Sequence, residues 1–408
     1  MMQIKPTLKW LLFYGLAYLG AFMALLSPIT VTLALRIGDL QPTNKTAILS
    51  VILGTGAFAA LISNPIFGRL SDRSTLKLGR RRGFIIIGTI LATSLLLILP
   101  LFTTIWVIAV VWILVQITYN IALSALSAVI ADQVAEDFRG TAAAAQGLGG
   151  TLGVLIGVSL ASAFNQQPIL SFGVPAVVGG VLVLLFGFSM SDTPSTTQVK
   201  KEAIVHQVLA SFSFNPFKSL DYTKSLLARF MLLVGTGLVT SYQVYFMQDQ
   251  LGWSRSKTAA MIVIITIVGG ALGVLGNVLS GVLSDKYGRR KIFLLVSAIL
   301  FSLATLVLAF FNSFAVLIVV VVMLGWAQGV IGTLAYAITT LVLPDQQQTG
   351  KWLGIANISA TLPQSVAPAI APLFLAIAGP NNYTALFIAA AVIELIGGWL
   401  VYQIKTVK

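Results

Sequence analysis

The sequence contains no cysteine and a single histidine, His206. Without cysteine, the chain has no disulfide, no thiolate nucleophile and no cysteine-bound metal site. His206 lies in a polar segment in the middle of the chain, so we expect neither histidine catalysis nor a histidine proton relay. Because the sequence shows no nucleophile–base pair and no metal-ligand set, we predict that the protein is not an enzyme and needs no metal or other cofactor.

Charged residues are also scarce, at 9% of 408 residues, whereas soluble domains carry roughly 25%. Apolar residues make up 57% of the chain and form long runs, such as 105–130 and 294–311. A helix of about 20 such residues crosses the roughly 30 Å of hydrocarbon in a bilayer. Transmembrane β-barrels show alternating segments of about 10 residues instead, and the sequence lacks that pattern. We therefore predict a polytopic helical membrane protein.

The apolar runs predict twelve spans, and thus an all-α fold of two pseudo-symmetric six-helix bundles. The expected spans are 10–35, 47–70, 83–101, 105–131, 141–164, 171–190, 225–248, 258–281, 292–311, 314–341, 351–377 and 383–404. The N-terminal bundle then occupies residues 1–190 and the C-terminal bundle residues 223–408. The polar segment 191–222 is expected to be a cytoplasmic linker between them.

The net charge of +13 is distributed as an inserted membrane protein requires. With both termini in the cytoplasm, every lysine and arginine, Arg229 included, falls on the cytoplasmic side except Arg36, Lys45, Arg255 and Lys257. This asymmetry is the positive-inside rule. The charge therefore indicates membrane insertion and contact with lipids, and not nucleic-acid binding. We expect a multi-pass protein of the cell membrane, the inner or plasma membrane of a bacterium.

One charged motif occurs in both halves of the chain. The first copy reads Gly68-Arg-Leu-Ser-Asp72-Arg73, followed by Gly79-Arg80-Arg81-Arg82, and the second reads Gly281-Val-Leu-Ser-Asp285-Lys286-Tyr-Gly288-Arg289-Arg290-Lys291. Asp72 and Asp285 are 213 residues apart, and the same offset relates Asn64 to Asn277 and Asp132 to Asp345. The repeat predicts a duplicated helical bundle, which in membranes is typical of transporters.

This loop pattern, together with six plus six spans, resembles the major facilitator superfamily. In the first copy, residues 74–78 separate Arg73 from Gly79, where the second copy has only Tyr287. That longer loop resembles the glycoside–pentoside–hexuronide symporters and the sucrose-type carriers. The resemblance implies a secondary-active or facilitative transporter that moves a small organic solute by alternating access. Those symporters typically have aspartate where this chain has Asn64, which argues against sodium coupling.

The resemblance also implies that Asp72 and Asp285 contact the N-termini of the eleventh and fifth spans, respectively, and thereby gate the cytoplasmic side. Basic residues of the loops, and the charged turn that ends the fourth span, are expected to lock this gate. Alternatively, the basic residues only enforce topology, and the turn is a solvated loop. The gating candidates are Gly68, Asp72, Arg73, Arg80, Asp132, Arg139, Gly281, Asp285, Lys286 and Arg289.

Polar side chains inside spans normally face the interior of the bundle or a cavity. Gln116 and Asn120 are four residues apart and share one helix face, as do Asn357 and Thr361. Neutral amides, hydroxyls and tyrosines suit a sugar or another uncharged polar compound. Alternatively, they form only hydrogen bonds between helices. The substrate-binding candidates are Gln116, Tyr119, Asn120, Gln146, Tyr242, Gln243, Gln328, Tyr336, Asn357, Thr361 and Gln364.

Glu394 is the only acidic residue placed well inside a predicted span, and it is the candidate carrier of a coupling proton. The alternative function is a multidrug/proton antiporter that exports amphipathic compounds. Such antiporters carry a Gly-x-x-x-Gly-Pro-x-x-Gly pattern in the fifth span, and here residues 146–157 are rich in glycine but lack the proline. In either case we expect the chain to work as a monomer with a small-molecule substrate.

Overall fold

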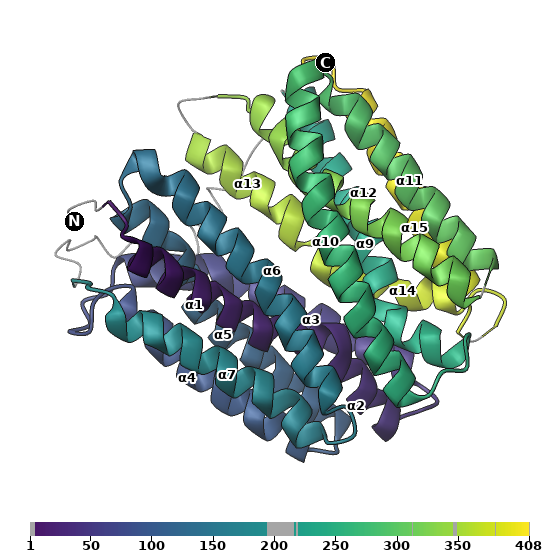
Figure 1. Cartoon of the computed structure of the whole chain (residues 1–408), viewed down its shortest axis with the longest axis horizontal. Helices are drawn as coiled ribbons and strands as arrows, with labels where there is room; N and C mark the ends of the chain where they lie inside the picture. Colours follow the sequence, from purple (N-terminus) through teal and green to yellow (C-terminus); the bar gives the residue numbers. More distant parts are fainter. Residues whose placement is uncertain are drawn as a thin grey trace. The chain divides into compact units, whose positions relative to one another are not determined.

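A computed structural model describes residues 5–193, 216–217, 219–311, 313–345, 349–379 and 381–407 (Figure 1). Most of the predicted linker 191–222, including His206, lies outside these residues. The described chain is helical and contains no strand. Within the described ranges, twelve helices or helix pairs are long and apolar enough to cross a membrane. The predicted all-α, twelve-span fold is confirmed, and the chain is a multi-pass membrane protein.

The chain divides into two compact units, one of Met1–Ile48 and Thr55–Val208 and the other of Leu49–Gly54 and Leu209–Lys408. The first six spans follow one another along the chain. They are α1 (Leu8–Ser27) continuing through a π-helical turn (Pro28–Thr32) into α2 (Leu33–Leu40), α3 (Lys45–Asp72), α4 (Arg82–Ile98), α5 (Ile105–Gln133), α6 (Arg139–Ala163) and α7 (Pro168–Ser189).

The second six spans follow in the same way. They are α9 (Leu220–Asp249), α10 (Arg255–Tyr287), α11 (Arg290–Phe310), α12 (Phe314–Leu341), the pair α13 (Thr349–Thr361) and α14 (Pro363–Leu375), and α15 (Tyr383–Tyr402). The break between α13 and α14 falls at Leu362, directly before Pro363. Proline has no N–H to donate, so the helical hydrogen-bond ladder is interrupted at Pro363, although Leu362 itself keeps helical backbone angles. The two helices together form one span, Trp352–Leu375.

The helix pairs of one unit repeat in the other. In the first unit, α1 packs on α7 and α4 packs on both α5 and α7. In the second unit, the corresponding spans pair as α9 with α15, α11 with α12 and α11 with α15. Equivalent packing of equivalent spans is the structural counterpart of the duplicated sequence motif.

Glycines of the fifth span bring α6 close to α1. Gly149, Gly153 and Gly157 recur every four residues and therefore lie on one face of α6. A Cβ atom on Gly157 would lie only 2.7 Å from the carbonyl oxygen of Met23 on α1. Small residues at such positions let two membrane helices approach backbone to backbone. The glycine-rich pattern of this span is thus explained by helix packing within the first unit.

Candidate functional site

Arg81 lies at the centre of a network of charged side chains in the first unit, beside the signature loop. Its guanidinium pairs with the carboxylates of Asp72, at the end of α3, and Asp132, near the end of α5; the Nε–Oδ2 distance to Asp132 is 2.8 Å. The remaining donors reach the Ser71 hydroxyl and, at 3.3 Å, the Gly68 carbonyl oxygen. The side chain of Arg81 is only 5% exposed, so burial and two carboxylates hold it in one place.

The backbone of the loop is shaped to deliver Arg81 to this position. Gly79 has φ +104°, a conformation that L side chains rarely adopt. A Cβ atom there would also lie 2.7 Å from the Asp192 side chain. The same Asp192 carboxylate accepts hydrogen bonds from the backbone N–H groups of Arg81 and Arg82, at 2.6 and 2.9 Å. An acidic residue is favourable there because α4 begins at Arg82, and a helix N-terminus leaves unpaired N–H groups.

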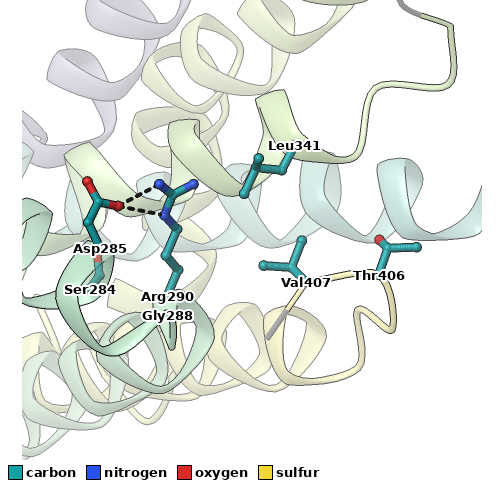
Figure 2. A pocket seen from close by; sticks show the side chains of 7 residues that line it. All are labelled: Ser284, Asp285, Gly288, Arg290, Leu341, Thr406 and Val407. Atoms are coloured by element: carbon teal, nitrogen blue, oxygen red, sulfur yellow. Dashed lines mark hydrogen bonds and ion pairs between the residues drawn. The ribbon is translucent and has the colours of Figure 1, made fainter.

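The second unit carries a corresponding but more open pair. Arg290 donates to Asp285 Oδ1 from Nη2 at 2.6 Å and from Nε at 3.2 Å, as Figure 2 shows. Both groups line a cleft of about 340 Å³, together with Leu341, Thr406 and Val407. The side chain of Arg290 is 29% exposed, compared with 5% for Arg81. The two loops therefore share one ion pair but differ in how deeply it is buried.

The arginines that pair with Asp72 and Asp285 within each unit were not among the gating candidates. The gating roles of Arg73, Arg80, Lys286 and Arg289 stay predictions, and the observed ion pairs are formed by Arg81 and Arg290. Each is the second residue after its loop glycine, Gly79 or Gly288, so the repeat itself contained the signal. Of the predicted basic residues, Arg80 does contact Asp132, at 3.0 Å.

The other gating candidates make local contacts. Arg139 donates to the carbonyl oxygens of Val134 and Ala131 at the end of α5, at 3.4 and 3.3 Å. Lys286 lies 5.9 Å from the ring centroid of its neighbour Tyr287. A Cβ atom on Gly281 would meet no described atom within 4 Å. The gating roles of these residues stay predictions.

The polar candidates of the first unit lie around one hydrogen-bonded pair of side-chain amides. Asn64 on α3 donates from Nδ2 to Asn120 Oδ1 at 2.9 Å, and Asn120 donates to the backbone carbonyl oxygen of Gln116, four residues earlier, at 2.8 Å. Gln116 and Asn120 are both buried on α5, and so is Tyr119, whose hydroxyl has no hydrogen-bond partner among the described residues. Gln146 on α6 lies apart from them, 3.5 Å from the Tyr14 hydroxyl.

The candidates of the second unit divide between buried and exposed positions. Tyr242 is fully buried on α9 and donates to the Pro368 carbonyl oxygen at 3.2 Å, while Gln243 lines a small, mainly apolar cavity of about 40 Å³. Gln328 and Thr361 are half-buried, and the Thr361 hydroxyl donates to the Asn357 carbonyl oxygen. The exposed candidates are Tyr336, Asn357 and Gln364.

Glu394 is fully buried on α15 and faces α9. Its carboxyl group lies directly against Gly235, where any side chain would collide with it. Neither carboxyl oxygen has a hydrogen-bond partner among the described residues. Burying a charge without a partner is costly, so this position is unusual for a residue with only a packing role.

The sequence matches the Major Facilitator Superfamily over residues 10–276 and again over 225–407. It is similar to the multidrug resistance protein MdtG of Escherichia coli O81 (strain ED1a), with 25% identity over 314 residues, which are 74% of this chain and 72% of the relative. The MdtG protein of Escherichia coli (strain K12 / DH10B) is 25% identical over 303 residues, 71% of this chain and 70% of its own.

Solved structures of transporters have the same fold. The nucleoside transporter NupG superimposes with a TM-score of 0.73 at 15% identity, covering 97% of this chain and 99% of that one. A D-xylose–proton symporter gives a TM-score of 0.70 at 16% identity, covering 97% and 96%. None of these similarities is specific to the glycoside–pentoside–hexuronide symporters. The duplicated loops, the repeated helix pairs and the match over both halves show that this chain belongs to the major facilitator superfamily and is a transporter of that superfamily.

Proposed function

We propose that this transporter carries a small polar organic solute, with a sugar as the leading candidate, by alternating access. The observation that supports this proposal is the hydrogen-bonded pair of side-chain amides, Asn64 and Asn120, one helical turn from the buried Gln116 within the first unit. Amides both donate and accept hydrogen bonds, as do the hydroxyl groups of a sugar. The unpartnered hydroxyl of Tyr119 on the same helix adds a group that a solute or an ordered water would satisfy.

The signature loops are proposed to act as the gate, on the side that we expect to be cytoplasmic. Asp72 and Asp285 each have one arginine partner within their own unit, Arg81 and Arg290. Alternating access requires contacts that form in one state and break in the other. The more exposed pair, Asp285–Arg290, is the one that we expect to exchange partners more readily, because less burial opposes its separation.

A second candidate function is export of amphipathic compounds. The similarity to MdtG, named a multidrug resistance protein, favours it. Against it stands the absence of proline from residues 146–157, whose glycines pack α6 on α1. The apolar lining of the small cavity beside Gln243 is compatible with either substrate class.

Proteoliposome counterflow separates the two functions. The protein is reconstituted with unlabelled D-glucose, D-xylose or uridine inside, and entry of the labelled compound is measured. Saturable counterflow of at least one of these solutes, without extrusion of ethidium or a similar cationic dye, is the expected result. Dye extrusion without counterflow of any of them would replace the sugar proposal with the exporter.

Glu394 is proposed as the group that couples transport to protons. Uptake of a proton would remove its charge at a site that offers no counter-ion among the described residues. Glu394→Gln should therefore retain counterflow but lose accumulation driven by an imposed proton gradient. Unchanged gradient-driven accumulation in that variant would leave Glu394 without a coupling role.

A further inference from the structure

Arg229 is a cation inside a membrane-spanning helix. It is the tenth residue of α9, about 14 Å along the helix axis from Leu220, and an apolar stretch, 230–234, follows it directly. The positive-inside rule assigned Arg229 to the cytoplasmic side of the expected span 225–248. In the structure the helix extends beyond Arg229 on both sides, as part of the seventh span, Leu220–Asp249. Ionisable residues at such positions are costly and mark binding sites or pathways for polar solutes.

The contacts of Arg229 orient its charge without neutralising it. Its Nη1 donates to the Ala356 carbonyl oxygen on α13 at 3.3 Å, and its guanidinium carbon lies 5.1 Å from the ring centroid of Tyr336 on α12. Neither partner carries a formal charge. Within the part of the chain that the structure describes, no carboxylate forms an ion pair with Arg229. Arg81, by contrast, is held by two carboxylates.

The guanidinium therefore retains donors for another group. Arginine has five N–H donors in a planar fork, and only one atom of the fork is engaged by Ala356. A guanidinium group that stacks on an aromatic ring keeps the N–H groups along its edge available, and two of them match the two oxygens of a carboxylate or phosphate. Arg229 is half-buried and Tyr336 is 45% exposed, so the pair is accessible. Asn357, beside Ala356 on α13, is exposed as well.

We propose that Arg229 and Tyr336 form an anion-binding subsite in the second unit, which takes the carboxylate or phosphate group of the transported solute. This inference rests on the proposed function and narrows it. The solute is then a sugar or similar polar compound that carries an acidic group, and not the wholly uncharged compound expected from the amides. Within the second unit, Arg229 supplies the charge that selects such a solute over a neutral analogue.

Matched pairs of probes test the subsite. Binding of D-glucuronate, D-glucose 6-phosphate and D-glucose to the purified protein is measured by thermophoresis for the wild type, Arg229→Gln and Tyr336→Phe. The control is Lys224→Gln, which removes one positive charge from the same helix, where Lys224 donates to the Gln403 carbonyl oxygen and interacts with the Asp221 carboxylate. We expect the wild type and the control to bind an acidic probe at least tenfold more tightly than D-glucose.

Arg229→Gln should lose that preference by tenfold or more, because a hydrogen bond to a charged group is lost, whereas its affinity for D-glucose should stay within about twofold. Tyr336→Phe keeps the ring and should keep the preference. If the Arg229→Gln variant does not fold, Arg229→Lys, which retains the positive charge but lacks the planar guanidinium, is measured in its place. An equal preference in wild type and Arg229→Gln, or no preference in the wild type, would overturn the subsite.

The phosphate of a lipid headgroup would bind Arg229 through the same hydrogen bonds as an acidic solute, so a separate experiment distinguishes the two. The variants are reconstituted in phosphatidylcholine with or without phosphatidylglycerol, and thermal stability is measured. If Arg229→Gln abolishes stabilisation by phosphatidylglycerol but leaves glucuronate binding unchanged, the site belongs to lipid and the solute subsite is wrong. Counterflow of neutral sugars together with anion binding that does not depend on Arg229 would refute the anion-binding subsite and leave the proposed function standing. Arg229-dependent anion binding without counterflow of D-glucuronate or of any neutral solute would refute the proposed function alone.

Discussion

Replacing Arg81 with glutamine should destabilise the first unit more than any other single change in its signature loop. The substitution removes a cation that pairs with Asp72 and Asp132 and that also donates to Ser71 and Gly68. Asp72 then loses this partner, whereas Asp132 keeps its ion pair with Arg80, at 3.0 Å.

The exposure of the partners sets the expected magnitude. Removing one member of a buried pair costs about 3–5 kcal/mol, because the other charge is left uncompensated. Here the arginine is buried, but the Asp72 and Asp132 side chains are 51% and 19% exposed, so water recovers part of that cost. Hydrogen bonds to charged groups contribute about 1.5–3 kcal/mol each, and partial exposure of the two carboxylates lowers the cost of leaving them unpaired. We therefore expect the free energy of unfolding to fall by about 2–3 kcal/mol.

Equilibrium unfolding in mixed micelles, by titration with dodecyl sulfate, measures this loss. Arg82→Gln is the matched control, because the described guanidinium contact of Arg82 is one long bond of 3.4 Å to the Phe188 carbonyl oxygen. Its effect should stay within about 0.5 kcal/mol. A cycle of Arg81→Gln, Asp132→Asn and the double variant should give a coupling energy of about 1–2 kcal/mol. Equal effects of Arg81→Gln and Arg82→Gln, or a coupling energy near zero, would refute the account of this network.

Other substitutions test the remaining features. Gly79→Ala should lower the free energy of unfolding in detergent by about 1–3 kcal/mol, because φ +104° and the nearby Asp192 side chain both oppose a Cβ atom. An unchanged free energy of unfolding would show that the loop has another conformation in solution. Asp72→Asn should reduce the turnover rate more than substrate affinity, and an unchanged transport velocity in counterflow would remove the gating role. Gly157→Val should impair folded yield on size-exclusion chromatography because a valine meets the α1 backbone, and a normal yield would contradict the close approach of α6 to α1.

Much of the architecture followed from the sequence because a bilayer imposes a simple local rule. A spanning helix must satisfy its own backbone hydrogen bonds and present about 20 apolar residues, so composition along the chain reveals the spans. The duplication was visible for a similar reason, since Asp72 and Asp285 keep one offset with their neighbours. The break between α13 and α14 has an equally local cause, because Pro363 has no N–H to donate.

The partners of charged side chains were less predictable. Asp72 pairs with Arg81, nine residues away, and not with the adjacent Arg73, because the longer first loop returns to the end of α3 with Gly79 in a left-handed conformation. Asp285 pairs with Arg290 after a shorter loop, so the number of residues between aspartate and arginine differs, and only the position after the loop glycine is shared by the two pairs. Such pairing depends on where the backbone of the loop places each side chain, and several arginines in a row are equivalent in a linear reading.

The sequence by itself determined that this protein is a duplicated, twelve-span membrane transporter, because the length and polarity of each segment are local properties that the bilayer reads directly. Only the tertiary structure decided that Glu394 faces Gly235 and that Arg229 stacks on Tyr336 without an acidic partner in the described chain. Those relationships join helices that are more than 100 residues apart in sequence, and they exist only once the helices have packed against one another.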